Sequence, residues 1–497
     1  MIDQLEARLR DALTVSLAET PNAPSASDIA RFLDTTMTVQ PTPEPAHRSN
    51  RSLVMAGVAV AAAVIGLVVI VSTRPVADTA SSASAVVGWV IVDDPTSQFM
   101  VEPGIAEMTT PDGIRMTSTN SISVYHLEPT SHGLIAVGAE QDGFARTAAI
   151  WRSSNGTAWE RVDDTGVLGA LDDRDDPTTP TSMIVDIAEF QGRLIAIGNT
   201  QPAGTAGSLV GSSLEPAAWA SDDGSTWTRL TLPEAPLAAD GTGAMFTAIT
   251  TTSTGWATVV SNGQIDEFGR ADGTSEVWTT TTGTDWTRST PIPAGAMIES
   301  IAAIPAGTII GGTDSTGQPI VWTSADNASW QRVPLPSDGI GFVARIIQIG
   351  DTAVAISSTS SAPGVGYSQT DTGFALEGTS SLRIWTSTDG LTWQTPPIPT
   401  ELAAPQQWTT SAAGSPTGAV IAVRTMDVNG PAVWTLTTAD GHTWTAAPTT
   451  TPGTITAIAS IDTTWVAAST GDLDPFAPDT HGTSNSRNTV ILTATTS

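Results

Sequence analysis

The sequence predicts an all-β domain made of repeated four-stranded sheets and held to a membrane by one helix. Tryptophan pairs recur along the chain, and each pair encloses a short polar turn. Short apolar or Thr-rich runs alternate with Gly, Asp or Asn around every pair, as strands alternate with turns. One uncharged segment near the N-terminus is long enough to cross a lipid bilayer.

Composition and charge narrow the range of partners. The 497 residues include 50 Asp or Glu against 20 basic residues, all of them Arg, and the net charge is −30. Because nucleic-acid affinity comes mainly from cationic side chains, we expect no nucleic-acid partner. The absence of Cys excludes disulfides and thiolate metal ligands. Arg without Lys, together with abundant Ala and Thr, indicates a GC-rich bacterial genome.

The membrane-spanning helix is predicted over Leu53 to Val71, nineteen residues without a charge. Such a helix is about 28 Å long, enough to cross the core of a bilayer. About fifty residues precede it, which favours an uncleaved anchor over a signal peptide. Cleavage near residues 83–85 is the alternative. Positive charge is denser on the N-terminal flank, so we expect the N-terminus in the cytoplasm and the C-terminal domain outside the membrane.

Four regions follow from this anchor. We expect cytoplasmic helices and a Pro/Thr linker in residues 1–50, the transmembrane helix in 51–74, an extracytoplasmic linker in 75–111 and the β domain in 112–497. Apolar residues recur every three or four positions from Ile2 to Ala18, and a second short helix is expected from Ser25. These helices would either dock a cytoplasmic partner or pack on each other or on a second copy, and we favour packing.

The tryptophan repeat predicts the architecture of the β domain. Twelve of the sixteen Trp residues fall in six pairs, and the second Trp recurs after 57 residues on average. Four strands fit each unit, and the second strands are almost continuously apolar, as strands buried on both faces are. Such units in series, each covered by its neighbours, predict a β-propeller, with a sandwich array as the alternative. The pairs are Trp151/Trp159, Trp219/Trp227, Trp278/Trp286, Trp322/Trp330, Trp385/Trp393 and Trp434/Trp444.

The enclosed turns share a chemistry. In the second copy, Asp223 can accept hydrogen bonds from turn amides, Gly224 can adopt a positive φ and Trp227 can pack the hairpin. This turn resembles the Asp box, the bacterial neuraminidase repeat of sialidases and other propellers, although it is one residue shorter. In that family the turns hold the blades together and do not bind substrate. The resemblance therefore implies a structural role for Asn155, Gly156, Trp159, Asp223, Gly224, Trp227, Gly283, Trp286, Asp326, Trp330, Asp389, Gly390, Trp393, Asp440, Gly441 and Trp444.

We expect seven blades, with six as the alternative. Three strands follow the last Trp pair, so the fourth strand of that blade has to come from the other end of the domain. The segment from Asp112 to Met116 mimics the turn and strand of the second copy and is our prediction for the closing strand. The segment from Gly88 to Asp93 is the competing candidate.

Long loops between second and third strands are the predicted recognition surface. They carry five of the eleven Phe and Tyr residues, and exposed aromatic residues are typical of binding sites. The alternative is that each aromatic ring only packs its own loop onto the domain. The candidate binding residues are Phe144, Phe268, Arg270, Tyr367, Phe374 and Phe476.

Catalysis is not predicted. Sialidases need an Arg cluster, a Tyr activated by Glu and an Asp acid, but this chain has two Tyr and no Arg-x-Pro motif near the start of the β domain. One carboxylate per turn is also too few for calcium, so we expect no metal and no cofactor. We expect a non-enzymatic, extracytoplasmic binding or scaffold module for a protein or glycan. An envelope glycoside hydrolase of the sialidase-like class is the alternative, since its two carboxylates could come from many pairs.

Overall fold

The chain divides into two units, Met1–Gly57 and Val58–Ser497, and the residues that the structure describes all belong to the second. The computed structural model describes residues 89–92, 99, 105–109, 115–142, 145–163, 166–169, 181–201, 214–235, 243–262, 274–292, 296–337, 339–360, 366–370, 373–428, 430–449, 453–470 and 489–495. The predicted transmembrane segment and the predicted N-terminal helices lie outside these ranges. No helix within these ranges is long and apolar enough to span a bilayer.

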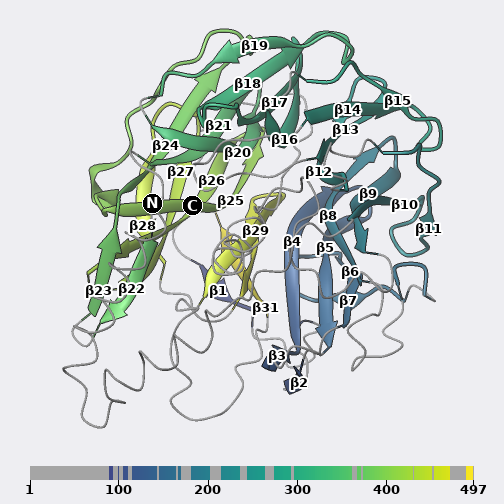
Figure 1. The fold of residues 1–497 in the computed structure, drawn as a ribbon, viewed down its shortest axis with the longest axis horizontal. Coiled ribbons are helices and arrows are strands. Elements are labelled where there is room, and N and C mark those ends of the chain that lie inside the picture. Colours follow the sequence, from purple (N-terminus) through teal and green to yellow (C-terminus); the bar gives the residue numbers. More distant parts are fainter. Residues whose placement is uncertain are drawn as a thin grey trace, which may run out of the picture. The chain divides into compact units, whose positions relative to one another are not determined.

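Seven antiparallel sheets follow one another along the chain and form the blades of a β-propeller, which confirms the prediction of seven blades (Figure 1). Blade 1 consists of β4 (Ser121–Thr130), β5 (Gly133–Asp142), β6 (Ala145–Ser153) and β7 (Glu160–Arg161). Blade 2 consists of β8 (Thr181–Phe190), β9 (Arg193–Gln201), β10 (Glu215–Ser221) and β11 (Thr228–Arg229). Blade 3 consists of β12 (Met245–Thr252), β13 (Gly255–Asn262), β14 (Thr274–Thr280) and β15 (Thr287–Arg288).

The remaining blades repeat this order. Blade 4 consists of β16 (Met297–Ile304), β17 (Gly307–Thr313), β18 (Pro319–Ser324) and β19 (Gln331–Pro334). Blade 5 consists of β20 (Ile340–Ile349), β21 (Thr352–Ser360) and β24 (Ser380–Ser387), with a bridge from Thr386 to Gln394 where a fourth strand would lie. Blade 6 consists of β25 (Gln406–Ser415), β26 (Gly418–Asp427), β27 (Gly430–Thr438) and β28 (Thr445–Pro448). Blade 7 consists of β29 (Thr454–Ile461), β30 (Thr464–Thr470), β31 (Thr489–Thr495) and β1 (Val90–Ile91).

The strand that closes blade 7 is β1, and our prediction of Asp112 to Met116 for this role was wrong. Val90 pairs with Thr493 and Ile91 with Leu492, so the two ends of the propeller meet in one sheet. The strand β3 (Arg115–Thr119) instead forms a separate hairpin with β2 (Ile105–Thr109). The physical reason is Trp89, which directly precedes β1 as the second Trp of a pair precedes the fourth strand elsewhere, and which is buried between blades 6 and 7.

The first strand of every blade is the innermost, and each contacts the first strand of the next blade, including β29 with β4, so the ring is closed. All seven of these strands carry a β-bulge, where the register with the second strand shifts by one residue. A bulge changes which face of a strand a residue lies on. The seven bulges therefore set which side chains of the innermost strands share a face.

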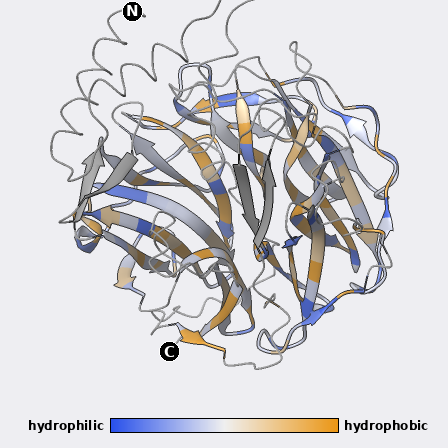
Figure 2. Ribbon diagram, turned by 60° about the horizontal axis from the view of Figure 1, so that its bottom comes forward, coloured by the Kyte–Doolittle hydropathy of each residue, from blue (hydrophilic) through white to orange (hydrophobic). Residues whose placement is uncertain are grey.

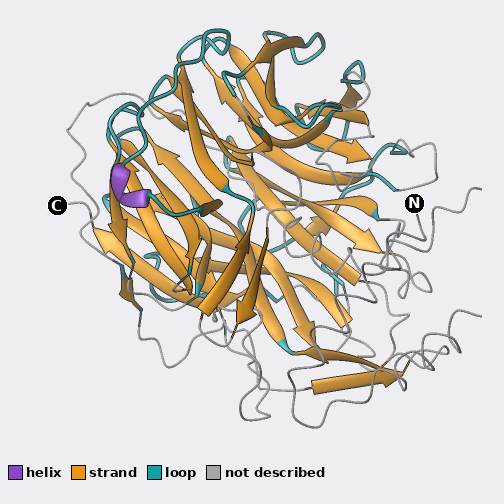
Figure 3. Ribbon diagram, turned by 60° about the vertical axis from the view of Figure 1, so that its left-hand side comes forward, coloured by secondary structure: helices purple, strands orange, loops and turns teal. Residues whose placement is uncertain are grey.

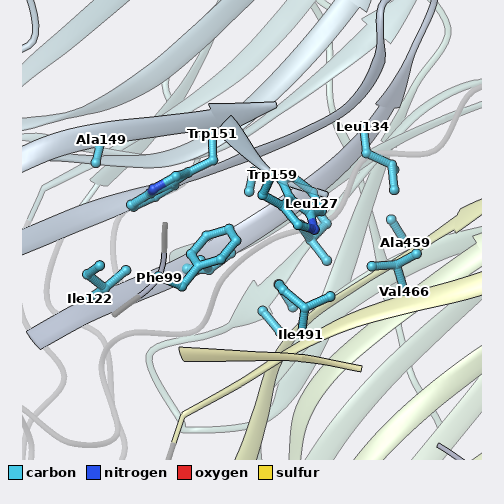
Figure 4. Packing of buried hydrophobic residues seen from close by; sticks show 14 residues of the cluster. Phe99, Ile122, Leu127, Leu134, Ala149, Trp151, Trp159, Ala459, Val466 and Ile491 are labelled. Atoms are coloured by element: carbon cyan, nitrogen blue, oxygen red, sulfur yellow. The ribbon is translucent and has the colours of Figure 1, made fainter. Parts of the chain in front are cut away.

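Apolar cores fill the interfaces between blades. Hydrophobic residues lie mainly along the strands, while turns and connections are more hydrophilic (Figure 2). Between blades 7 and 1, Phe99 packs against Trp151 and Trp159, with ring centroids 5.0 and 5.5 Å apart (Figure 4). Strands and loops make up the described chain apart from one short 3-10 helix, η1 (Thr400–Leu402), before blade 6 (Figure 3).

Candidate functional site

The two faces of the propeller differ in how regular they are. Because neighbouring strands are antiparallel, the first-to-second and third-to-fourth connections lie on one face, which we call the turn face. The second-to-third connections and the links between blades lie on the other, which we call the loop face. On the turn face, every first-to-second turn has two residues and every third-to-fourth turn in blades 1–6 has six. On the loop face, second-to-third connections range from two residues, 143–144, to 361–379 and 471–488.

The six-residue turns are built by the polar residues that the sequence singled out. Asp223 Oδ1 accepts hydrogen bonds from the backbone N–H groups of Ser225 and Thr226, at 2.8 and 2.7 Å. Ser221 Oγ accepts from the N–H of Gly224 at 2.9 Å, and Gly224 has φ +71°. The N–H donors lower the pKa of Asp223 well below its usual range. In four turns the second Trp donates Nε1–H to the glycine carbonyl, namely Trp159, Trp227, Trp393 and Trp444.

The substituted copies form the same turn. Asn155 accepts from the N–H groups of residues 157 and 158 at 2.9 and 3.0 Å, and Thr282 accepts two N–H bonds at 3.2 and 3.3 Å. Asn327 stands where the other turns have Gly and has φ +57°. Asp326, Asp389 and Asp440 each accept two backbone N–H bonds as Asp223 does. The substituted copies therefore keep the side-chain oxygen that accepts the two N–H bonds and the positive φ, although the residue types differ.

In five of the six turns the glycine also packs against the second strand of the preceding blade. A Cβ placed on Gly156 would come within 2.6 Å of Val466 in blade 7. The same test on Gly283 finds Ile195 of blade 2 at 3.0 Å, and on Gly390 finds Ile309 of blade 4 at 3.2 Å. These contacts hold neighbouring blades together, and at these positions Gly combines a positive φ with a close approach to the preceding blade.

The candidate binding residues fall mostly outside the described chain. Phe144, Phe268, Arg270 and Phe476 lie there. Tyr367 and Phe374 lie on a hairpin inserted between β21 and β24, formed by β22 (Gly366–Thr370) and β23 (Gly373–Glu377). The register pairs Tyr367 with Leu376 and Phe374 with Gln369. This insertion is therefore a hairpin within a second-to-third connection, and its two paired strands carry both of the candidate residues that lie in the described ranges.

A layer of residues around the axis was missed by the sequence reasoning. The residues that directly follow the seven bulges occupy equivalent positions on the innermost strands, and we call them the axial ring. They are fully buried. The axial ring consists of His126, Asp186, Ala248, Ser300, Arg345, Ser411 and Ala457.

Blades 1 to 3 are tied together by a charged network in this ring. His126 Nδ1 lies 2.9 Å from Asp186 Oδ1, and its Nε2 lies 3.3 Å from Glu128 Oε2. Asp186 also accepts backbone N–H bonds from Ile187 at 2.8 Å and from Ile249 of blade 3 at 2.9 Å. Burial alone would lower the pKa of His126, but the two carboxylates outweigh it and raise the pKa to about 9. His126 is therefore an imidazolium at neutral pH.

Blades 4 and 5 place a second charged pair near the axis. Burial raises the pKa of Glu299, the bulge residue of β16, to about 7, although Arg345 opposes this. Burial likewise lowers the pKa of Arg345 to about 9, opposed by the charges of Asp186 and Glu299. Within the described part of the chain, no side-chain nitrogen of Arg345 has a hydrogen-bond partner. The described residues hold no cluster of three or more His, Asp or Glu that could bind a metal ion.

No protein-family model and no curated protein matches the chain. Solved structures of similar fold include a Trypanosoma rangeli sialidase complex (10% identity, TM-score 0.38, 69% of this chain and 56% of the sialidase). The phage phi92 endosialidase matches at 10% identity and a TM-score of 0.38, over 79% of this chain and 69% of the endosialidase. The WD40 repeats of RRP9 match at 12% identity and a TM-score of 0.37, over 83% of this chain and 99% of that structure. The matched part spans little more than half of the Trypanosoma enzyme. At these identities the likeness concerns the fold alone.

The turns predict a matched pair of variants. Asp223→Asn is expected to leave stability nearly unchanged, because Asn155 makes the same two bonds in blade 1. Asp223→Ala is expected to lower the free energy of unfolding by about 1 kcal/mol, since it removes the acceptor of those bonds. Urea unfolding followed by Trp fluorescence measures both. Equal stability of the two variants would contradict this account of the turn.

Glu299 predicts a pH dependence of stability. Its pKa is about 7 in the folded chain against an ordinary value of 4.5, so the folded state binds this proton more tightly. Stability from this group is complete below pH 4.5 and is lost as the pH rises to 7, by about 3 kcal/mol. Glu299→Gln is expected to flatten the dependence of the unfolding free energy on pH across that window, and Glu215→Gln, at an exposed position, is the surface control. An unaltered slope in Glu299→Gln would refute the assignment.

Proposed function

We propose that the chain is a membrane-anchored, extracytoplasmic β-propeller that binds a protein or glycan through its loop face, without catalysing a reaction. The difference between the two faces supports this most directly. The turn face has constant turn lengths and glycines in contact with the preceding blade, so insertions there would separate blades. The loop face carries nearly all of the variation in length, and such loops on a rigid scaffold are where binding residues gather.

We also assign the six polar turns as Asp boxes of a shortened form. The pattern of acceptors supports the assignment, since an Asp, Asn or Thr side chain accepts from two successive N–H groups in every copy. On this assignment the turns serve stability. The turn face then stabilises the contacts between blades, and the loop face is available to bind a ligand.

The anchor and the N-terminal helices complete the proposal. The uncharged run from Leu53 to Val71 supports a single span, and β1 begins nineteen residues after it. The blade that closes the ring is therefore also the blade next to the anchor in sequence. We propose that the N-terminus lies in the cytoplasm, where the helices pack or contact a partner.

The loop face is tested by replacing residues 361–378 with a short Gly-Ser turn in the full-length chain. The matched control is Asp222→Asn, an exposed change on the turn face. Binding of each chain is measured on a printed glycan array and on immobilised envelope proteins. The proposal expects the loop variant to lose at least tenfold in affinity for whichever probe the parent binds, and the control to bind normally. Loss confined to the control would contradict it.

A glycoside hydrolase is the second candidate, and Glu299 is the observation that favours it. A glycosidase acid needs a raised pKa, and a second carboxylate has to lie nearby. Glu299 has a pKa of about 7, and the charge of Arg345 interacts with both Glu299 and Asp186. Incubation with fluorogenic glycosides separates the candidates. Turnover that disappears in Glu299→Gln would replace the binding proposal, whereas the binding proposal expects none.

A further inference from the structure

The axial ring has two unlike halves. On blades 1 to 3 the charged side chains of the ring pair with each other. His126 forms an ion pair with Asp186, and Asp186 accepts a hydrogen bond from the backbone N–H of Ile249. On blades 4 to 6 the ring presents Ser300, Arg345 and Ser411, which follow the bulges of three neighbouring innermost strands. The second half of the ring therefore holds no carboxyl of its own, although Glu299 lies one position before Ser300.

The second half holds donors that have no acceptor. Nε, Nη1 and Nη2 of Arg345 have no hydrogen-bond partner among the described residues, and neither do the hydroxyls of Ser300 and Ser411. All three side chains are completely buried. A buried guanidinium has five N–H donors and no acceptor atom, and leaving it unpaired carries a large desolvation cost. A bound group rich in lone pairs would supply acceptors that these donors lack.

We propose that Arg345, Ser300 and Ser411 form a binding site at the propeller axis for a small monovalent oxyanion of the carboxylate class. The planar guanidinium donates two parallel N–H bonds to a carboxylate, and hydroxyls on either side supply further donors. The site is separate from the loop face and does not rest on the ligand proposed there.

Charge and size select this class of ligand. The carboxyls of Asp186 and Glu299 interact with Arg345 from other blades, so a dianion such as phosphate would add repulsion. A neutral Glu299, which its raised pKa favours below neutrality, repels an anion least. Ser300 and Ser411, the ring residues on the blades beside Arg345, are both small. A bound anion would then accept hydrogen bonds from blades 4 to 6, as Asp186 accepts them from blades 1 and 3.

The test uses the full-length chain in detergent at pH 6, with sodium acetate exchanged for sodium chloride at constant ionic strength. Melting is followed by Trp fluorescence. An anion that binds only the folded chain raises Tm along a saturating curve. The parent chain is expected to show this curve with acetate, and Arg345→Gln is expected to show none. Arg152→Gln, which alters an exposed arginine, is the matched control and should keep the full response.

Smaller changes decide the matter if Arg345→Gln does not fold. Ser411→Ala and Ser300→Ala each remove one hydroxyl and are expected to raise the acetate concentration at half-saturation at least threefold. Absence of a saturating response in the parent chain would overturn the proposal. So would a response in Arg345→Gln equal to that of the parent, or unchanged half-saturation in both serine variants.

Discussion

The whole molecule depends on one constraint, that the first and last strands of the propeller must meet in the same sheet. Val90 and Ile91 pair with Thr493 and Leu492, and only this pairing gives blade 7 its outer strand. Each blade buries its apolar faces against two neighbours, so an open ring would expose two of these faces and the edges beside them. The core that includes Phe99, Trp151 and Val466 exists because blade 7 lies against blade 1.

The repeated turns also hold neighbouring blades together. A glycine in each of five turns contacts the blade before it, and the second Trp packs into the shared core. Close packing at these five positions disfavours an insertion or a bulkier residue. Variation in connection length is therefore confined to the opposite face. The separation of a structural face from a variable face follows from packing, and the proposed function rests on it.

Much of the fold could be predicted from the sequence, because its signals are local. A Trp in the third strand and a second Trp at the end of the six-residue turn that follows mark the third and fourth strands, and the spacing of the pairs marks the blades. The prediction of Asp112 to Met116 as the closing strand was wrong, because it rested on the residues of a turn and not on the apolar side chain that the blade interface requires. Asp112 and Gly113 mimic the turn, but Trp89 supplies the ring that the interface needs. Trp89 stands in the same place before its strand as Trp227 does before β11, and this was the usable signal.

The axial ring could not be predicted from one sequence. Membership depends on a one-residue bulge in each innermost strand, and no residue type marks these bulges, since Val185, Glu299 and Ala344 all stand at them. His126, Asp186 and Arg345 lie on strands far apart in the chain and meet only when the ring is closed. Their chemistry becomes visible only after topology and register are known.

Cross-linking of the closing strand tests the central claim most directly. The chain has no Cys, so a disulfide can form only between introduced residues. Directly opposed residues of antiparallel strands have Cα atoms about 4.5–5.5 Å apart, within reach of a disulfide. We predict that Val90→Cys/Thr493→Cys forms an intramolecular disulfide under mild oxidation, detected by mass, and that Met116→Cys/Thr493→Cys does not. A bond in the second pair and none in the first would contradict the closed ring described above.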